Sequence, residues 1–344
     1  MRVAVRVDGG TRIGMGHLIR QRTLAATLVD RGHEVTVVSA TPERARDIFE
    51  PLVTVESTER GPTATVGALE RTDHDVTVLD LPVESADPDA DLLDLSLQRA
   101  LDALETALAV VTDGVEQTVA CDLVVNGHVY ADRDGYSYRG TEPTWCLGTD
   151  YLLMDRAMRN VAADLDSDFD PSSTPERALV TMGGSDAADA TPTVMGAFDG
   201  LDVWTDVVVG PGFSEANVAA IEAAAGSIES RFEVVTDPPD FATRLARADL
   251  AVSALGLTAY ELLAVGTPFV GVTIAPDQRL KADALAARDA ALVLDGDWAG
   301  TDVRAAVETL VSNPDRRREL ARRGRSLVDT DGVERVADAL EALA

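Results

Sequence analysis

Lysine is almost missing from this chain: Lys281 is its only lysine among 30 basic residues, and the others are arginines. Acidic residues number 59, which gives a formal net charge of −29 at pH 7. Such a charge repels the phosphates of nucleic acids and argues against a nucleic-acid partner. The acidic residues are spread over the whole chain, as in proteins of salt-loving microbes, where a Debye length of about 3 Å at 1 M salt screens the repulsion.

Cysteine and long hydrophobic runs are also scarce. Cys121 and Cys146 are the only cysteines, too few for a disulfide framework and without zinc-site spacing, so we expect structural thiols, no metal and no other cofactor. No stretch approaches the ~18 apolar residues of a membrane span, and no basic and apolar leader opens the sequence. We therefore expect a cytoplasmic protein without a membrane span. The sequence leaves its oligomeric state open.

What the chain does contain is material for two α/β domains. Of its 344 residues, 46% are hydrophobic, enough for two cores. Short β-branched runs alternate with helical patterns over residues 2–127 and again from residue 177 onward, which predicts two mostly parallel sheets. Residues 159–175 are polar, contain two prolines and lack periodicity. We therefore predict two Rossmann-like domains that face a cleft: an N-terminal domain 1–158, a linker 159–175 and a C-terminal domain 176–344.

The stretch "RVDGGTRIGMGHLIRQRTLA", residues 6–25, has the layout of a strand, a glycine-rich loop and a helix. This layout suits an anion, because backbone amides can approach it and the helix N-terminus adds a positive dipole. His17, one of four histidines, would stand on the first turn of the helix at the mouth of the cleft. Alternatively, Gly14 and Gly16 only form a tight turn that His17 caps, and spacing alone does not decide between these interpretations.

The stretch "VTMGGSDAAD", residues 180–189, repeats this arrangement in the second half. An apolar strand leads to Gly183, Gly184 and Ser185, and a helix follows. The simpler interpretation is an ordinary turn, capped by Ser185 or Asp186. A diphosphate held at one or both glycine-rich loops would satisfy their backbone amides.

Residues 249–278 form the most informative stretch. A strand ends in a small-residue loop, Thr258 can cap the next helix, and Glu261 follows three residues later. This spacing fits a capping box, but a carboxylate beside a cleft could instead accept hydrogen bonds from ribose hydroxyls. Asp277 and Gln278 follow the next strand and would border the same pocket.

A second histidine follows a strand of the first half. His128 and Asn126 come directly after the apolar run at 122–125 and could line the cleft. A surface loop is the more common setting for such a histidine, and we expect it here.

These stretches, together with "CLGTDYLLMDRAM" at 146–158, resemble the nucleotide-sugar hydrolases of pseudaminic acid biosynthesis and their spore-coat polysaccharide relatives. The likeness covers nearly the whole chain, and Gly-Met-Gly-His-x-x-Arg is its most specific motif. It implies the two-domain glycosyltransferase-B architecture, which the N-acetylglucosaminyltransferase of cell-wall precursor synthesis shares.

The resemblance also implies roles for individual residues. It places UDP in the C-terminal domain, with Gly184 and Ser185 near the diphosphate and Glu261 on the ribose. It places Thr258 at a helix start that faces a phosphate, and Gln278 near the sugar. His17 would be presented to the sugar as the catalytic residue. We assign nucleotide binding to Gly183, Gly184, Ser185, Leu255, Gly256, Thr258 and Glu261, and substrate binding to Asp8, Gly14, Gly16, Arg20, Asp80, Asp277 and Gln278.

The sequence departs from the family pattern at three places. Asp80-Leu81-Pro82 stands where the family usually has Asp-x-Tyr, so an aromatic group of the sugar site is missing. Asp277-Gln278 replaces the usual Asn-Gln pair, and Leu255 and Leu257 stand where glycine or serine is common.

These features predict a UDP-sugar hydrolase. Water activated by His17 would attack the anomeric carbon and release UDP and a free N-acetylated deoxy sugar, in nonulosonate or surface polysaccharide biosynthesis. One alternative is a glycosyltransferase, in which a sugar or lipid hydroxyl replaces water. A further alternative is a nucleotide-sugar-binding protein without catalysis.

Overall fold

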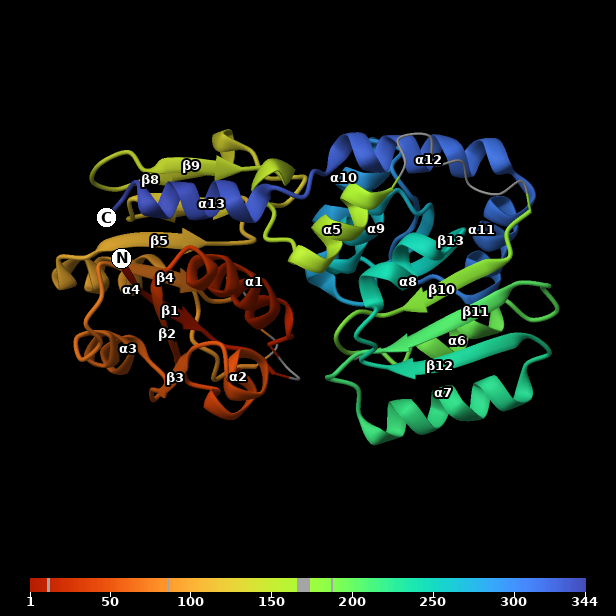
Figure 1. Cartoon of the computed structure of the whole chain (residues 1–344), viewed down its shortest axis with the longest axis horizontal. Helices are drawn as coiled ribbons and strands as arrows, with labels where there is room; N and C mark the ends of the chain where they lie inside the picture. The colour runs from red at the N-terminus through yellow and green to blue at the C-terminus, as the bar shows by residue number, and fades with distance from the viewer. Residues whose placement is uncertain (11–12, 84, 86, 166–173, 187) are drawn as a thin grey trace. The chain divides into compact units, whose positions relative to one another are not determined.

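The protein divides into two compact units, unit 1 with Met1–Asp155 and Asp331–Ala344, and unit 2 with Arg156–Thr330 (Figure 1). The structure is a computed structural model, and it describes residues 1–10, 13–83, 85, 87–165, 174–186 and 188–344. No helix in these described parts combines the length and apolar character that a membrane span needs.

Unit 1 is built on a seven-stranded sheet of order β3-β2-β1-β4-β5-β7-β9, in which every strand pair is parallel. Its strands are β1 (Arg2–Val7), β2 (Glu34–Ser39), β3 (Thr54–Ser57), β4 (Val76–Asp80), β5 (Ala107–Val111), β7 (Leu123–Asn126) and β9 (Thr144–Leu147). A separate small sheet pairs β6 (Gln117–Val119) with β8 (Tyr136–Tyr138).

The helices of unit 1 cover both faces of this sheet. They are α1 (Gly16–Asp30), α2 (Pro42–Phe49), α3 (Pro62–Leu69), α4 (Leu95–Leu101) and α13 (Gly332–Glu341), with 3₁₀ turns η1 (Asp102–Leu104), η2 (Arg133–Gly135) and η3 (Thr149–Tyr151). Val3 and Val5 of β1 belong to one core with residues of α1, α2 and α13, whereas Ala4 between them belongs to a second core with residues of α3 and α4. Successive side chains of a strand point to opposite faces, and a sheet buried on both faces reads as the continuous apolar runs seen in the sequence.

Unit 2 repeats the architecture with a six-stranded parallel sheet of order β12-β11-β10-β13-β14-β15. The strands are β10 (Arg177–Thr181), β11 (Trp204–Val209), β12 (Arg231–Thr236), β13 (Leu250–Ala254), β14 (Phe269–Val272) and β15 (Leu292–Leu294). The helices are α5 (Arg156–Asp164), α6 (Thr191–Gly196), α7 (Glu215–Ser227), α8 (Phe241–Arg247), α9 (Thr258–Val265), α10 (Arg279–Ala287), α11 (Gly300–Ser312) and α12 (Pro314–Leu327), with the 3₁₀ turn η4 (Pro276–Gln278).

Each sheet has one point at which the strand order reverses. In unit 1 this point lies between β1 and β4, and in unit 2 between β10 and β13. At such a point the chain leaves the two neighbouring strands in opposite directions, which opens a crevice beyond their carboxyl ends where open α/β sheets bind ligands. The loops that follow β1, β4, β10 and β13 are therefore the places to look for a site.

The structure corrects the domain boundaries predicted from the sequence. The predicted C-terminal domain 176–344 loses its last helix to unit 1, because Val333, Val336 and Leu340 of α13 are buried in the core that also contains α1. The predicted N-terminal domain 1–158 ends three residues earlier, at Asp155.

The predicted linker 159–175 also differs from the structure. Its first residues belong to α5, which packs in unit 2 through its one buried residue, Met158. Met158, Val161 and Ala162 do recur at helical spacing, but the polar composition of the segment led us to predict a linker. Residues 166–173 of this segment lie outside the described residues. The facing of the two domains across a cleft stays a prediction.

Candidate functional site

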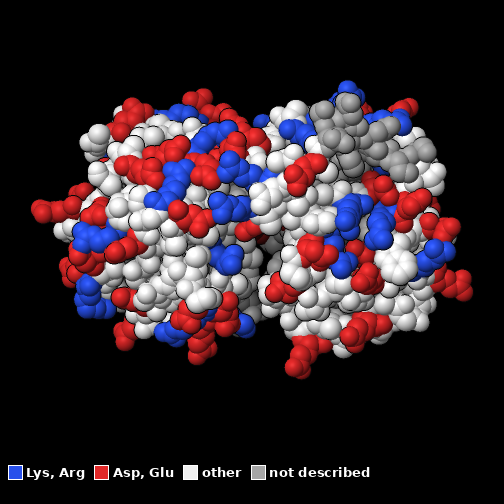
Figure 2. Space-filling model, viewed as in Figure 1, with Lys and Arg blue, Asp and Glu red and all other residues white. Residues whose placement is uncertain are grey.

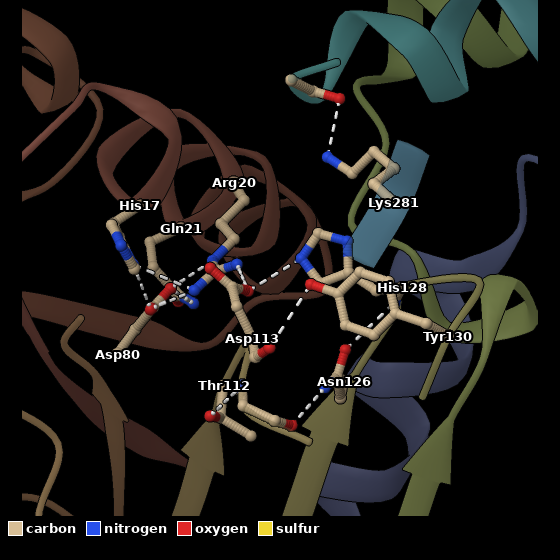
Figure 3. Close-up of polar contacts among 12 residues, drawn as sticks. His17, Arg20, Gln21, Asp80, Thr112, Asp113, Asn126, His128, Tyr130 and Lys281 are labelled. Carbon is tan, nitrogen blue, oxygen red and sulfur yellow. Dashed lines mark hydrogen bonds and ion pairs between the residues drawn. The ribbon is translucent and has the colours of Figure 1, made fainter. Parts of the chain in front are cut away.

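Charged side chains gather at the reversal point of unit 1, beyond the carboxyl ends of its strands (Figure 3). His17, Arg20 and Gln21 come from the first turns of α1, which follows β1, and Asp80 is the last residue of β4. The sheet pairs β1 with β4, with Val7 in register with Asp80. The first turns of α1 therefore lie beside the Asp80 carboxylate.

Asp80 is fully buried, and both of its oxygens are hydrogen-bonded. Its Oδ1 accepts hydrogen bonds from His17 Nδ1 at 2.7 Å and Arg20 Nη2 at 2.5 Å. Its Oδ2 accepts from Arg20 Nε and Gln21 Nε2, each at 2.7 Å. Burial alone would raise the pKa of Asp80, but the charges of Arg20 and His17 outweigh it and hold that pKa below its usual range. Asp80 is therefore an anion that fixes three side chains of α1.

These contacts decide which nitrogen of His17 carries the proton. Arg20 Nη2 lies 2.9 Å from His17 Nδ1 and can only donate, whereas the Asp80 oxygen at 2.7 Å can only accept. Without a proton on Nδ1, its lone pair would face a carboxylate lone pair at 2.7 Å, which is repulsive. We therefore assign the proton to Nδ1, from these partners. The lone pair of a neutral ring then lies on Nε2, where it can accept a proton from a nucleophile.

Asp113, His128 and Tyr130 extend this cluster on the other side of Arg20. Arg20 Nη1 donates to Asp113 Oδ1, and His128 Nε2 lies 2.9 Å from the same oxygen. His128 stacks on Tyr130 with ring centroids 4.9 Å apart and an interplanar angle of 9°. The expectation that His128 lies in a surface loop is wrong, because only 6% of the residue is exposed.

Asp113, Gln21 and Tyr130 are not among the residues predicted from the sequence, although the position of Asp113 carries a signal. Asp113 follows the apolar strand β5, which is the position where ligand-binding residues of parallel sheets occur. Gln21 and Tyr130 carry no comparable signal, because nothing in their local sequence indicates a partner on another strand.

Two other residues that the sequence assigns to substrate binding have structural partners. Asp8 is 2% exposed, and its carboxylate accepts hydrogen bonds from Arg6, Ser39 Oγ and the Ala40 amide. Gly14 forms a bridge with Gly10, in which each amide donates to the other carbonyl at 2.7 and 3.0 Å. Asp8 therefore lies outside the Asp80 cluster and stabilises the start of the loop.

Gly14 and Gly16 differ in their place in the backbone. Gly14 has a φ of 93°, a conformation that favours glycine. This value agrees with the tight-turn interpretation, although the His17 ring reaches Asp80 instead of capping the turn. Gly16 is the first residue of α1. The N-cap residue, Met15, makes no side-chain hydrogen bond to the backbone amides of the first turn.

In unit 2, Gly183, Gly184 and Ser185 follow β10 at the reversal point. Gly210, after the neighbouring β11, packs so closely on this loop that a Cβ there would lie 2.4 Å from the Gly183 carbonyl oxygen. Ser185 does not open a helix directly, contrary to expectation, because α6 begins only at Thr191. The Asp186 carboxylate accepts hydrogen bonds from the amides of Ala190 and Thr191 at the start of α6.

Thr258 and Glu261 follow β13 on the other side of the same reversal point. The capping-box interpretation of this pair is wrong. The N-cap residue is Leu257, which makes no side-chain cap bond, and Thr258 is already the first residue of α9. Glu261 is therefore one position too far along the helix to close a capping box.

Leu255 and Gly256 form the loop that leads into α9. Leu255 is fully buried, whereas the Gly256 carbonyl accepts a hydrogen bond of 2.9 Å from Lys281 Nζ (Figure 3). Lys281 is 6% exposed, and its ammonium lies 4.9 Å from the ring centroid of Tyr260. The chain's only lysine thus anchors this loop.

Asp277 and Gln278 lie in η4, after β14. Gln278 Oε1 accepts a hydrogen bond of 2.9 Å from the Ile274 amide, which orients the side-chain amide group, and Asp277 is exposed. In unit 2, the residues assigned to the nucleotide therefore follow β10 and β13, and the substrate residues Asp277 and Gln278 follow β14. In unit 1, the structure brings His17, Arg20 and Asp80 together.

No family model matches the chain. It is similar to the spore coat polysaccharide biosynthesis protein SpsG of Bacillus subtilis (strain 168), with 27% identity over 239 residues. The match includes 64% of this chain and 65% of the length of that relative.

Solved structures match over nearly the whole chain. MurG of Acinetobacter baumannii matches with a TM-score of 0.67 at 16% identity, covering 99% of both chains. The calicheamicin glycosyltransferase CalG4 matches with a TM-score of 0.65 at 16% identity, covering 100% of this chain and 98% of that one. MnaA of S. aureus, solved with UDP, matches with a TM-score of 0.63 at 10% identity, covering 99% and 96%. The predicted fold class is thereby confirmed: the chain has the two-domain α/β fold of the glycosyltransferase-B structures.

Proposed function

We propose that the protein is an enzyme that uses a UDP-sugar in surface polysaccharide biosynthesis and transfers the sugar to a hydroxyl group of an acceptor. The observation that carries this proposal is the His17–Asp80 pair on the first turn of α1, in which Asp80 binds Nδ1 and leaves Nε2 of a neutral ring to accept a proton. Asp80 holds the ring in one tautomer and stabilises the imidazolium that forms when Nε2 accepts a proton, as a buried aspartate does in catalytic triads.

The chemical step is a displacement at the anomeric carbon. The acceptor oxygen forms a bond to C1, the bond from C1 to the diphosphate oxygen breaks, and UDP leaves with the bonding electrons. The acceptor proton passes to His17 Nε2. Negative charge therefore develops on the diphosphate, where backbone amides and a helix N-terminus stabilise it.

Unit 2 supplies such groups for the nucleotide. The loop of Gly183, Gly184 and Ser185 and the start of α9 at Thr258 flank its reversal point. Glu261 lies in the first turn of α9, beside this reversal point, and a carboxylate there can accept hydrogen bonds from the ribose hydroxyls. We assign the uracil and ribose to this unit, and the proton transfer to unit 1.

The comparisons support transfer over hydrolysis. CalG4 is a glycosyltransferase, MnaA was solved with UDP, and the Bacillus relative acts in spore-coat polysaccharide biosynthesis. Fold and partial sequence similarity of this kind favour a nucleotide-sugar substrate and do not by themselves assign a reaction.

Hydrolysis is the second candidate, and the stretch around His17 favours it. Gly-Met-Gly-His-x-x-Arg at 14–20 resembles the nucleotide-sugar hydrolases of pseudaminic acid biosynthesis. In this version His17 activates water, and the products are UDP and a free N-acetylated deoxy sugar. The same base and the same leaving group serve both reactions.

One assay separates these functions. The protein is incubated in about 1 M KCl with a panel of UDP-sugars, with and without a set of monosaccharide and glycoside acceptors, and UDP is quantified by chromatography. UDP release that requires an acceptor supports transfer, and equal release without one supports hydrolysis. UDP binding without any release would contradict both and leave a nucleotide-sugar-binding protein.

A further inference from the structure

Asp113 has one carboxylate oxygen that the cluster around Arg20 does not use. Both Arg20 Nη1 and His128 Nε2 bind its Oδ1. Within the part of the chain that the structure describes, its Oδ2 has no hydrogen-bond partner, and the side chain is 39% exposed. Figure 3 shows this carboxylate between the Arg20 and His128 side chains.

Asp80, whose carboxylate also binds Arg20, differs from Asp113 because both of its oxygens are used. Asp80 is fully buried, and its two oxygens accept four hydrogen bonds from α1. One Arg20 guanidinium bridges both carboxylates. The two carboxylates therefore differ: Asp80 uses both oxygens and orients His17, whereas Asp113 keeps one oxygen open to solvent.

The open oxygen can only accept hydrogen bonds. Partial removal from water would raise the pKa of Asp113, but the charges of Arg20 and His128 hold that pKa well below its usual range. Asp113 therefore stays ionised, and an ionised carboxylate has no proton to donate. A ligand group that meets Oδ2 must bring an O–H or N–H donor.

The surroundings of Asp113 suit a sugar ring. His128 and Tyr130 form a stacked aromatic pair, and the Tyr130 hydroxyl donates to the Asp113 carbonyl at 3.3 Å. Aromatic faces pack on apolar C–H groups, while a few fixed polar atoms select the orientation of a ligand. Arg20 binds both the Asp113 carboxylate and His17, and it thereby links these two side chains.

We propose that Asp113 is a specificity residue whose Oδ2 accepts a hydrogen bond from one hydroxyl of the sugar that is transferred. The inference rests on the proposed function, since it takes the sugar of a UDP-sugar to be the ligand beside His17. It predicts that the enzyme requires a donor at one ring position and tolerates changes at the others.

The test compares the best UDP-sugar of the panel with analogues in which the hydroxyls at C3, C4 and C6 are replaced by fluorine one at a time. Fluorine cannot donate a hydrogen bond, and its inductive effect on the reaction is the same for every enzyme variant. We expect one analogue to lower the kcat/KM of the wild type about 10- to 100-fold more than the other two analogues do. This difference is the usual contribution of a hydrogen bond to a charged group.

In Asp113→Asn, the extra loss of kcat/KM with that one analogue should vanish, and the losses with the other two should match those of the wild type. Arg20 and His128 both donate, so they hold the amide oxygen of the variant toward themselves and turn its NH₂ group to the open side. The site then offers a donor where the wild type offers an acceptor. Asp47→Asn is the control for the lost charge, because Asp47 is exposed on α2; it should keep the wild-type ratios.

A purely structural Asp113 gives a different result. If Asp113→Asn lowers kcat/KM equally for all analogues, or leaves every ratio unchanged, the proposal is overturned. If the asparagine variant does not fold, Asp113→Glu keeps the charge and moves the oxygen by one methylene, and unchanged ratios there overturn the proposal as well. Absence of UDP release by the wild type is a separate outcome, which rejects the proposed function and this inference with it.

Discussion

At the scale of single residues, Glu261 shows how the structure separates two interpretations that the sequence left open. Because Leu257 is the N-cap of α9, the Glu261 side chain is not a capping-box partner. We expect Glu261→Ala to weaken UDP binding by about 1–3 kcal/mol, since charge-assisted hydrogen bonds to ribose are lost. Any change in melting temperature reports the contacts that Glu261 makes within the protein. Titration calorimetry with UDP, alongside thermal melting, measures both quantities.

Glu222 provides the matched control for this experiment. It is an exposed glutamate on α7 of the same unit, and Glu222→Ala should change neither the UDP affinity nor the melting temperature. Equal UDP affinity in the Glu261 variant and in this control would remove Glu261 from the nucleotide site.

The residues also show what local sequence can indicate. The layout around His17 and the small-residue loops predict where backbone turns occur, because glycine and helix-start preferences act over a few residues. The partners of these residues are not local: His17 meets Asp80 from β4, and Arg20 also meets Asp113 from the loop after β5. Such pairs depend on strand order, which one sequence does not specify, and so Asp113 and the burial of His128 were missed.

At the scale of elements, the C-terminal helix α13 is the least expected feature. Its apolar positions Val333, Val336 and Leu340 have helical spacing, which identifies a helix but not the sheet that it covers. Arg31, the C-cap residue of α1, forms ion pairs with Glu334, Asp338 and Glu341 of α13. Chain order alone suggests that a last helix stays with its preceding domain, and only the packing shows that it returns to unit 1.

A glycine at the start of α13 tests this packing. A Cβ on Gly332 would lie 2.3 Å from the Leu152 carbonyl oxygen and 2.5 Å from its nitrogen, and such overpacking costs about 1–3 kcal/mol. We expect Gly332→Ala to lower the melting temperature by several degrees. In Gly226→Ala on α7, where a Cβ meets nothing within 4 Å, the same substitution should be neutral or stabilise by about 0.5–1 kcal/mol. If both variants melt at the same temperature, α13 does not pack as described.

At the scale of the whole molecule, the net charge of −29 sets the solution behaviour. Figure 2 shows acidic side chains distributed over the visible face, with basic ones between them. Repulsion among the excess carboxylates reaches about 10 Å in 0.1 M salt and about 3 Å in 1 M salt. We expect the melting temperature at pH 7 to rise between 0.1 and 1 M KCl.

The pH dependence of this salt effect identifies its cause. Near pH 4.5, about half of the ordinary glutamate side chains are protonated, so less repulsion remains to be screened and the gain from KCl should shrink. A gain of equal size at both pH values would mean that salt acts on something other than the net charge.

Turnover in the wild type and in His17→Asn shows whether His17 is the base of a UDP-sugar reaction. The measurement uses the UDP-sugar and acceptor conditions that give UDP release, together with UDP titration of both proteins. We predict that turnover in His17→Asn falls about 10²- to 10⁴-fold, which is the usual contribution of a positioned general base. UDP affinity and melting temperature should stay nearly unchanged. Wild-type turnover in the asparagine variant would contradict this prediction and leave His17 as a structural partner of Asp80.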